Sequence, residues 1–129
     1  MIDYNKESLR IQNILNKDLE KDIFEVKYDH CGVHDIYIED QHCNHLFIQP
    51  DWHQTQSDFE KNGATWMLSD GKLTISRLKD EVAISKIVNK YGFEIDKKRI
   101  KKDNIREKDL QDVVLKLIKA INDIHFNAG

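Results

Sequence analysis

The sequence predicts an α+β fold, a largely antiparallel sheet with N-terminal, middle and long C-terminal helices packed on it. Three segments repeat apolar residues at helical spacing, near the start, in the middle and at the end of the chain. Between them lie several short stretches that alternate apolar with polar residues, as half-buried strands do. A chain of 129 residues is long enough for one core, so we expect a single domain over residues 1–129.

The first half predicts one helix and three strands. Apolar residues recur close to helical spacing from Lys6 to about Asp22, with Lys and Glu on the other side. The stretches "IFEVKY" (23–28), "DIYIE" (35–39) and "HLFIQ" (45–49) alternate in character, so each predicts a half-buried strand.

The stretch "ATWMLSDGKLTISRL" (64–78) predicts a β-hairpin. Two apolar runs flank Asp70-Gly71, a dipeptide suited to the positive φ angles of a tight hairpin turn. Trp66 lies in the first run, where its large apolar side chain predicts a core position.

The remaining elements follow in order. Residues 80–92 return to helical spacing, with Gly92 placed to end the helix at the C′ position. A second hairpin is predicted in "FEIDKKRIKKD" (93–103). The last segment predicts a long helix with one apolar face, formed by Leu110, Val113, Val114, Leu117, Ile118, Ile121 and Ile124.

Composition narrows the class of protein. The 23 acidic and 20 basic residues are interspersed and give a net charge of −3, which selects neither a broad nucleic-acid surface nor an acidic mimic of one. No stretch approaches the roughly 20 apolar residues of a membrane span, and no signal-peptide pattern begins the chain. We therefore expect a soluble protein of the host cytoplasm.

Both Cys and five of the six His lie between positions 30 and 53. Zinc takes four N or S ligands, usually as pairs from two turns. Cys31-x-x-His34 and Cys43-x-His45 supply such pairs, with His30, His42 and His53 in reserve, so we expect a zinc site. The alternative is that the His residues are solvated and the Cys buried as small apolar groups.

The zinc prediction carries a geometric condition. If Asp35 to Glu39 forms one straight strand, its ends are separated by roughly 15 Å. Four ligands divided between those ends could not share one ion. The site would then use one end only, such as His42, Cys43 and His45 with a distant partner.

Catalysis is not expected. A thiolate nucleophile at Cys31 or Cys43 would need an orienting group and an oxyanion element, which the sequence does not assign. The segment "DHCGVHD" superficially offers nuclease-type ligands, but at no recognised spacing. There is also no G-x-x-x-x-G-K-[ST] loop to hold a nucleotide.

The stretch 64–78, together with "NKYGFEIDKKRI" (89–100) and "LQDVVLKLIKAINDI" (110–124), resembles an uncharacterised small-domain family of phages and mobile elements of Gram-positive bacteria. The resemblance covers roughly the C-terminal half and implies a fold and a phage-like setting, without catalytic residues. The tract from about Gln41 to Asn62 looks inserted relative to that family. By class, the chain is also similar to phage anti-CRISPR inhibitors of type II RNA-guided nucleases.

These expectations point to a binding protein. Trp52 lies in a polar loop, where an aromatic side chain suits an interface anchor, and Asp51, Asp58 and Glu60 around it suit a basic partner surface. The expected partner is a host protein, a CRISPR effector nuclease whose loading with target DNA would be blocked. The alternative is a metal-stabilised nucleic-acid-binding regulator that uses "KKRIKK" (97–102), a basic run flanked by Asp96 and Asp103.

Overall fold

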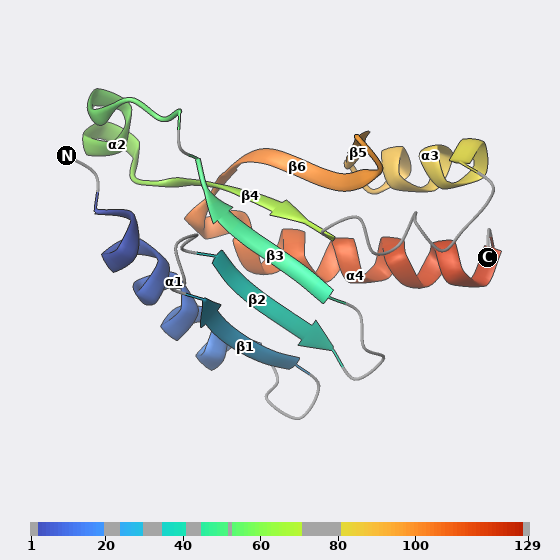
Figure 1. The fold of residues 1–129 in the computed structure, drawn as a ribbon, viewed down its shortest axis with the longest axis horizontal. Helices are drawn as coiled ribbons and strands as arrows, with labels where there is room; N and C mark the ends of the chain where they lie inside the picture. Colours follow the sequence, from blue (N-terminus) through green and yellow to red (C-terminus); the bar gives the residue numbers. More distant parts are fainter. Residues whose placement is uncertain are drawn as a thin grey trace.

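The computed structural model describes residues 3–19, 24–29, 35–40, 45–51, 53–70 and 81–127. The described strands form one sheet in the order β1-β2-β3-β4-β6-β5, and every pair of neighbours is antiparallel. Figure 1 shows α1 beside the β1–β3 part of this sheet and α4 running along its β4–β6 part. The predicted α+β class is therefore confirmed.

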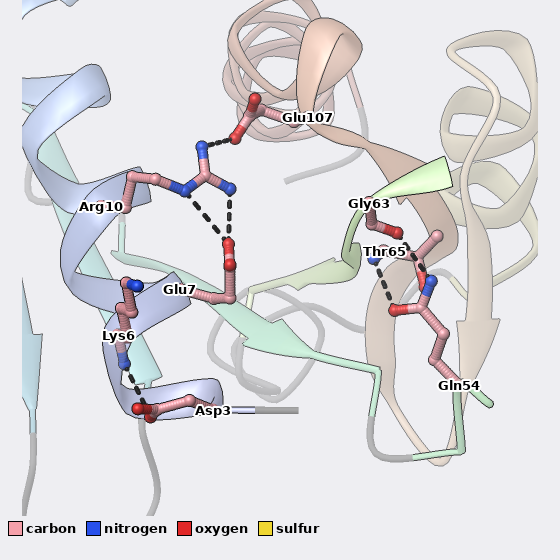
Figure 2. A network of polar contacts seen from close by, with 8 residues as sticks. All are labelled: Asp3, Lys6, Glu7, Arg10, Gln54, Gly63, Thr65 and Glu107. Carbon is pink, nitrogen blue, oxygen red and sulfur yellow. Dashed lines mark hydrogen bonds and ion pairs between the residues drawn. The ribbon is translucent and has the colours of Figure 1, made fainter. Parts of the chain in front are cut away.

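Helix α1 (Tyr4–Asp18) covers the first three strands. The Asp3 side chain caps its start by accepting a hydrogen bond from the Lys6 backbone N–H at 3.1 Å (Figure 2). Ile11, Leu15 and Leu19 are buried at four-residue intervals, as the apolar period predicted. The helix starts earlier and ends earlier than the predicted range.

Strands β1 (Phe24–Asp29), β2 (Asp35–Asp40) and β3 (His45–Pro50) match the three predicted strands. Burial alternates along β3, so Leu46 and Ile48 face the core while His45 and Phe47 lie on the half-exposed face. Since β3 lies between β2 and β4, the tract predicted as an inserted loop at 41–62 contains a central strand of the sheet.

The predicted β-hairpin around Asp70-Gly71 is wrong, because the strand before the turn pairs with other strands. Strand β4 (Thr65–Ser69) pairs with β3 on one edge and with β6 on the other, so neither edge is left for the second run. Residues 71–80 lie outside the described part of the chain. The Asp70 side chain instead accepts a hydrogen bond at 3.0 Å from the backbone N–H of Ile100 in β6. Trp66 is fully buried, as predicted.

The end of α3 (Glu81–Lys90) follows the predicted stop signal. Gly92 has a φ of +87°, and its N–H donates to Asn89 O at 3.1 Å. The N–H of Phe93 donates to Val88 O at 2.9 Å, and both of these side chains are buried. This pair of bonds is the Schellman arrangement, which satisfies the last carbonyls of the helix.

The C-terminal third contains the second predicted hairpin, β5 (Glu94–Asp96) with β6 (Arg99–Arg106). A short 3-10 turn, η2 (Glu107–Asp109), leads into α4 (Leu110–Asn127). The predicted apolar face of α4 is buried apart from Ile118, which is partly buried against the core. No described helix has the length and apolar character needed to cross a membrane.

Helices α1 and α4 are linked through Arg10 (Figure 2). Its guanidinium pairs with Glu7 one turn earlier in α1 and with Glu107 in η2. Beside this link lies a cavity of about 240 Å³ with a mixed lining of Ile11, Ile14, Leu15 and Leu110 together with Glu107, Lys108 and Gln111. The Arg10–Glu107 ion pair therefore joins α1 to η2, the turn from which α4 begins.

Candidate functional site

The segment around α2 (Gln56–Asn62) holds the described members of the predicted partner-binding set. We call residues 53–65 the α2 loop. Gln54 connects the parts of this loop, because its amide donates to Gly63 O at 2.7 Å and to Asp58 Oδ2 at 2.7 Å. The Gln54 carbonyl accepts from the Thr65 N–H at 3.0 Å, so one side chain joins both ends of the loop (Figure 2).

Asp51 and Thr55 complete this framework. The carboxylate of Asp51 accepts from the His53 N–H at 3.0 Å and from Thr65 Oγ1 at 3.1 Å. The hydroxyl of Thr55 caps α2 by accepting from the Asp58 N–H at 3.1 Å. Both carboxylate oxygens of Asp51 thus accept hydrogen bonds from the α2 loop, and this residue helps to hold the loop in place.

Asp58 keeps its negative charge through neutral donors. Hydrogen bonds from Gln54 and from Asn62, the latter at 2.8 Å, lower the pKa of this carboxyl below 3.8, and Arg106 at 3.6 Å adds a smaller attraction. Glu60 is exposed and accepts only from Gln56, at 3.1 Å, among the described residues. The α2 loop is therefore an ordered surface that carries Asp58 and Glu60 beside Lys61. None of the α2 side chains is fully buried, although Phe59 packs against the core. Trp52 lies outside the described residues.

The geometric condition on the predicted zinc site concerns strand β2. Strand β2 is continuous from Asp35 to Asp40 and pairs along its length with β1. Its ends are about 16 Å apart at ~3.3 Å per residue. A site that used residues from both ends of β2 would have to bridge this distance. Residues 30–34 and 41–44 lie outside the described part of the chain, so the zinc site stays a prediction.

Two of the predicted ligands are described. His45 begins β3 and His53 follows its end, so they lie at opposite ends of the strand. Among the described residues, no group of three or more His, Cys, Asp or Glu side chains is arranged to hold a metal. The other predicted ligands and reserves, Cys31, His34, Cys43, His30 and His42, lie outside the described part of the chain.

His45 belongs to a small cluster on the half-exposed face of β2 and β3. Its Nδ1 is hydrogen-bonded to the Tyr37 hydroxyl, and its Nε2 lies 4.0 Å from Glu39 Oε1. The Tyr37 ring also packs against Phe47, with ring centroids 5.4 Å apart. We call Tyr37, Glu39, His45 and Phe47 the β2–β3 cluster. Sequence analysis found only His45, although the alternation of β2 places Tyr37 and Glu39 on one face.

The basic run at 97–102 divides into two parts. Lys101 lies among three carboxylates, at 2.9 Å from Asp103 and 3.7 Å from both Glu94 and Asp96, and these raise its pKa above 10.5. Lys97 and Lys98 form the exposed tip, with φ values of +51° and +65°. No ion pair of either tip lysine is found among the described residues. The run therefore presents a smaller free positive charge than its sequence predicted.

In comparisons with known proteins, no family model, curated protein or solved structure matches this chain. The structure thus defines the class of the protein, an α+β fold with a six-stranded antiparallel sheet. The resemblance to a phage family and to anti-CRISPR proteins stays a prediction from the sequence.

Proposed function

We propose that this chain is a non-catalytic binding protein that presents the α2 loop to a basic surface of a protein partner. The observation that carries the proposal is that α2 is held at both ends by Gln54, Asp51 and Thr55, yet buries no side chain. Phe59 packs partly buried against the core, while the exposed side chains of α2 remain available to a partner. Loops positioned in this way by a rigid scaffold commonly carry function.

The charge of the α2 loop determines the kind of partner. Asp58 stays ionised because its pKa is lowered, and Glu60 is exposed. Negative side chains of this kind steer a basic surface into encounter, with an association rate that falls as salt rises. Because the loop is already ordered by its own hydrogen bonds, it would lose little conformational entropy on binding.

The most concrete version follows the sequence resemblance. In it, the protein acts in the cytoplasm of the host cell as an anti-CRISPR, occupies the basic nucleic-acid channel of an RNA-guided nuclease and blocks the loading of target DNA. Trp52 would add an aromatic anchor beside the acidic residues. Zinc is part of this proposal, although the hydrogen bonds of the described α2 loop give it order without a metal.

The alternative is a nucleic-acid-binding regulator that uses the β5–β6 hairpin. It is favoured by the exposed Lys97 and Lys98, whose positive φ values hold them at the tip of the hairpin. Lys101 contributes little to this reading, because three carboxylates already surround it.

The experiment compares two single neutralisations in binding to a purified type II RNA-guided nuclease with its guide RNA. Glu60→Gln should raise the Kd about fivefold and flatten its dependence on salt, as for a charge at an interface rim. Glu94→Gln, which removes an exposed Glu of β5 in the hairpin far from α2, should leave the Kd unchanged. Absence of binding by the wild-type protein would exclude the anti-CRISPR version.

The same proteins also test the alternative. Replacing Lys97, Lys98 and Arg99 by Ala should abolish binding to short DNA and RNA duplexes if the hairpin is a nucleic-acid contact. Under the favoured proposal, this triple variant binds and inhibits the nuclease like the wild type.

A further inference from the structure

We propose that Glu39 and His45 bind a divalent transition metal ion, zinc above all, on the half-exposed face of β2 and β3. The two residues are direct cross-strand partners in the antiparallel pair, so the backbone of the sheet fixes their spacing. Side chains in such pairs lie on the same face with Cβ atoms about 5 Å apart. This site assigns ligands to the zinc that the proposed function includes, and partner binding through the α2 loop does not depend on it.

The separation of the two donor atoms suits one metal ion. Glu39 Oε1 and His45 Nε2 are 4.0 Å apart. Two ligands of a tetrahedral zinc, with bonds of about 2.0 to 2.1 Å, are separated by roughly 3.4 Å. A small side-chain adjustment closes this difference, and both side chains are about one-third exposed, at 31% and 29%, so an ion can reach them.

Tyr37 can hold His45 in the tautomer that metal binding at Nε2 requires. Its hydroxyl is hydrogen-bonded to Nδ1 of His45, which leaves Nε2 directed at Glu39. In the tautomer with the proton on Nδ1, the ring donates to the Tyr37 oxygen and Nε2 has a free lone pair. Histidines that ligate metals almost always use their second nitrogen in this way, so Tyr37 is a positioning residue.

The chemistry of the pair selects the class of metal. Imidazole nitrogen with one carboxylate oxygen favours zinc, copper or nickel over calcium and magnesium, which prefer oxygen ligands alone. Two protein ligands leave the remaining positions of the ion for water or for additional ligands. The site lies at one end of β2, which is the arrangement that the continuous strand permits.

The test is calorimetric titration of metal-free protein with zinc chloride. We expect saturation at one zinc per chain, a loss of at least tenfold in affinity for Glu39→Gln and for His45→Gln, and a loss of about tenfold for Tyr37→Phe. The control is His125→Gln, which replaces an exposed His near the end of α4 and should bind zinc like the wild type.

Two further readouts separate ligation from folding. Circular dichroism should show that each variant keeps its melting temperature without zinc to within a few degrees. In the wild type, zinc should shift the ¹⁵N resonance of His45 Nε2 and leave that of His125 in place. Wild-type protein that binds no zinc, or variants at positions 39 and 45 that bind it with undiminished affinity, would overturn the proposal. Nuclease binding is measured separately, so the two proposals can fail independently.

Discussion

The α2 loop and the β5–β6 hairpin lie at opposite ends of β6 and organise charge in different ways. In the α2 loop, the amides of Gln54 and Asn62 donate to Asp58, and Arg106 lies 3.6 Å from it, so the lowered pKa keeps this carboxyl ionised. In the hairpin, three carboxylates surround Lys101, one of the cations of the basic run at 97–102. Charge that is concentrated in a sequence is therefore not always the charge that a fold presents. This contrast favours the acidic surface over the basic one as the binding site.

The largest loss of stability is expected where β4 meets the β5–β6 hairpin, at the hydrogen bond between Asp70 and Ile100. Asp70 is fully buried and accepts a hydrogen bond from the Ile100 N–H, so Asp70→Ala would leave a buried donor unsatisfied. We expect the free energy of unfolding to fall by about 2 kcal/mol in urea denaturation. Asp70→Asn keeps an acceptor and should lose less. Equal losses for both variants would mean that the hydrogen bond to Ile100 contributes little.

The corresponding change in the α2 loop is Gln54→Ala. It removes the acceptor of the buried Thr65 N–H and two donated hydrogen bonds, so the free energy of unfolding should fall by about 1 to 2 kcal/mol. Amide exchange should accelerate at Thr65. Gln56→Ala, which loses one exposed contact to Glu60, is the matched control and should change stability by less than about 0.5 kcal/mol. Slow exchange at Thr65 in Gln54→Ala would show that the loop is ordered by other contacts.

Substitutions at the tip of the β5–β6 hairpin should increase the stability of the protein. Lys97 and Lys98 both have positive φ, the geometry of a two-residue turn that prefers Asn-Gly. Replacing them with Asn and Gly should raise the free energy of unfolding by about 1 kcal/mol, because left-handed conformations are costly for lysine. A gain in stability with a loss of DNA binding would support the nucleic-acid alternative. A gain in stability without any change in DNA binding would indicate that the hairpin tip is not a nucleic-acid contact.

The smallest expected effect is the dependence of stability on acidic pH through Asp58. Since the pKa of Asp58 is lowered in the folded protein, its contribution to stability is present above pH 3.8 and is lost as the pH falls through the folded-state pKa. NMR titration should find that pKa below 3.8 in the wild type. In Asn62→Ala the value should move upward, because one donor to the carboxylate is gone. An unchanged value would assign the shift to Gln54 and Arg106.

The sequence alone determined the elements whose signals are local. The four-residue spacing of Ile11, Leu15 and Leu19 fixes the buried face of α1, and the C′ glycine fixes the end of α3. The apolar period of the last segment likewise determined α4. These predictions succeeded because helix faces and helix ends depend on residues within one or two turns of each other.

Tertiary structure decided which strands are neighbours. Asp70-Gly71 has the local signature of a hairpin turn, yet β6, which begins 30 residues after Ser69, occupies the edge of β4 on that side. The same rule governs the candidate sites. Glu39 faces His45, and Lys101 meets Glu94, only because of the register between antiparallel strands. Register and strand order arise from burying one continuous core across the whole chain, and no short window of sequence contains that information.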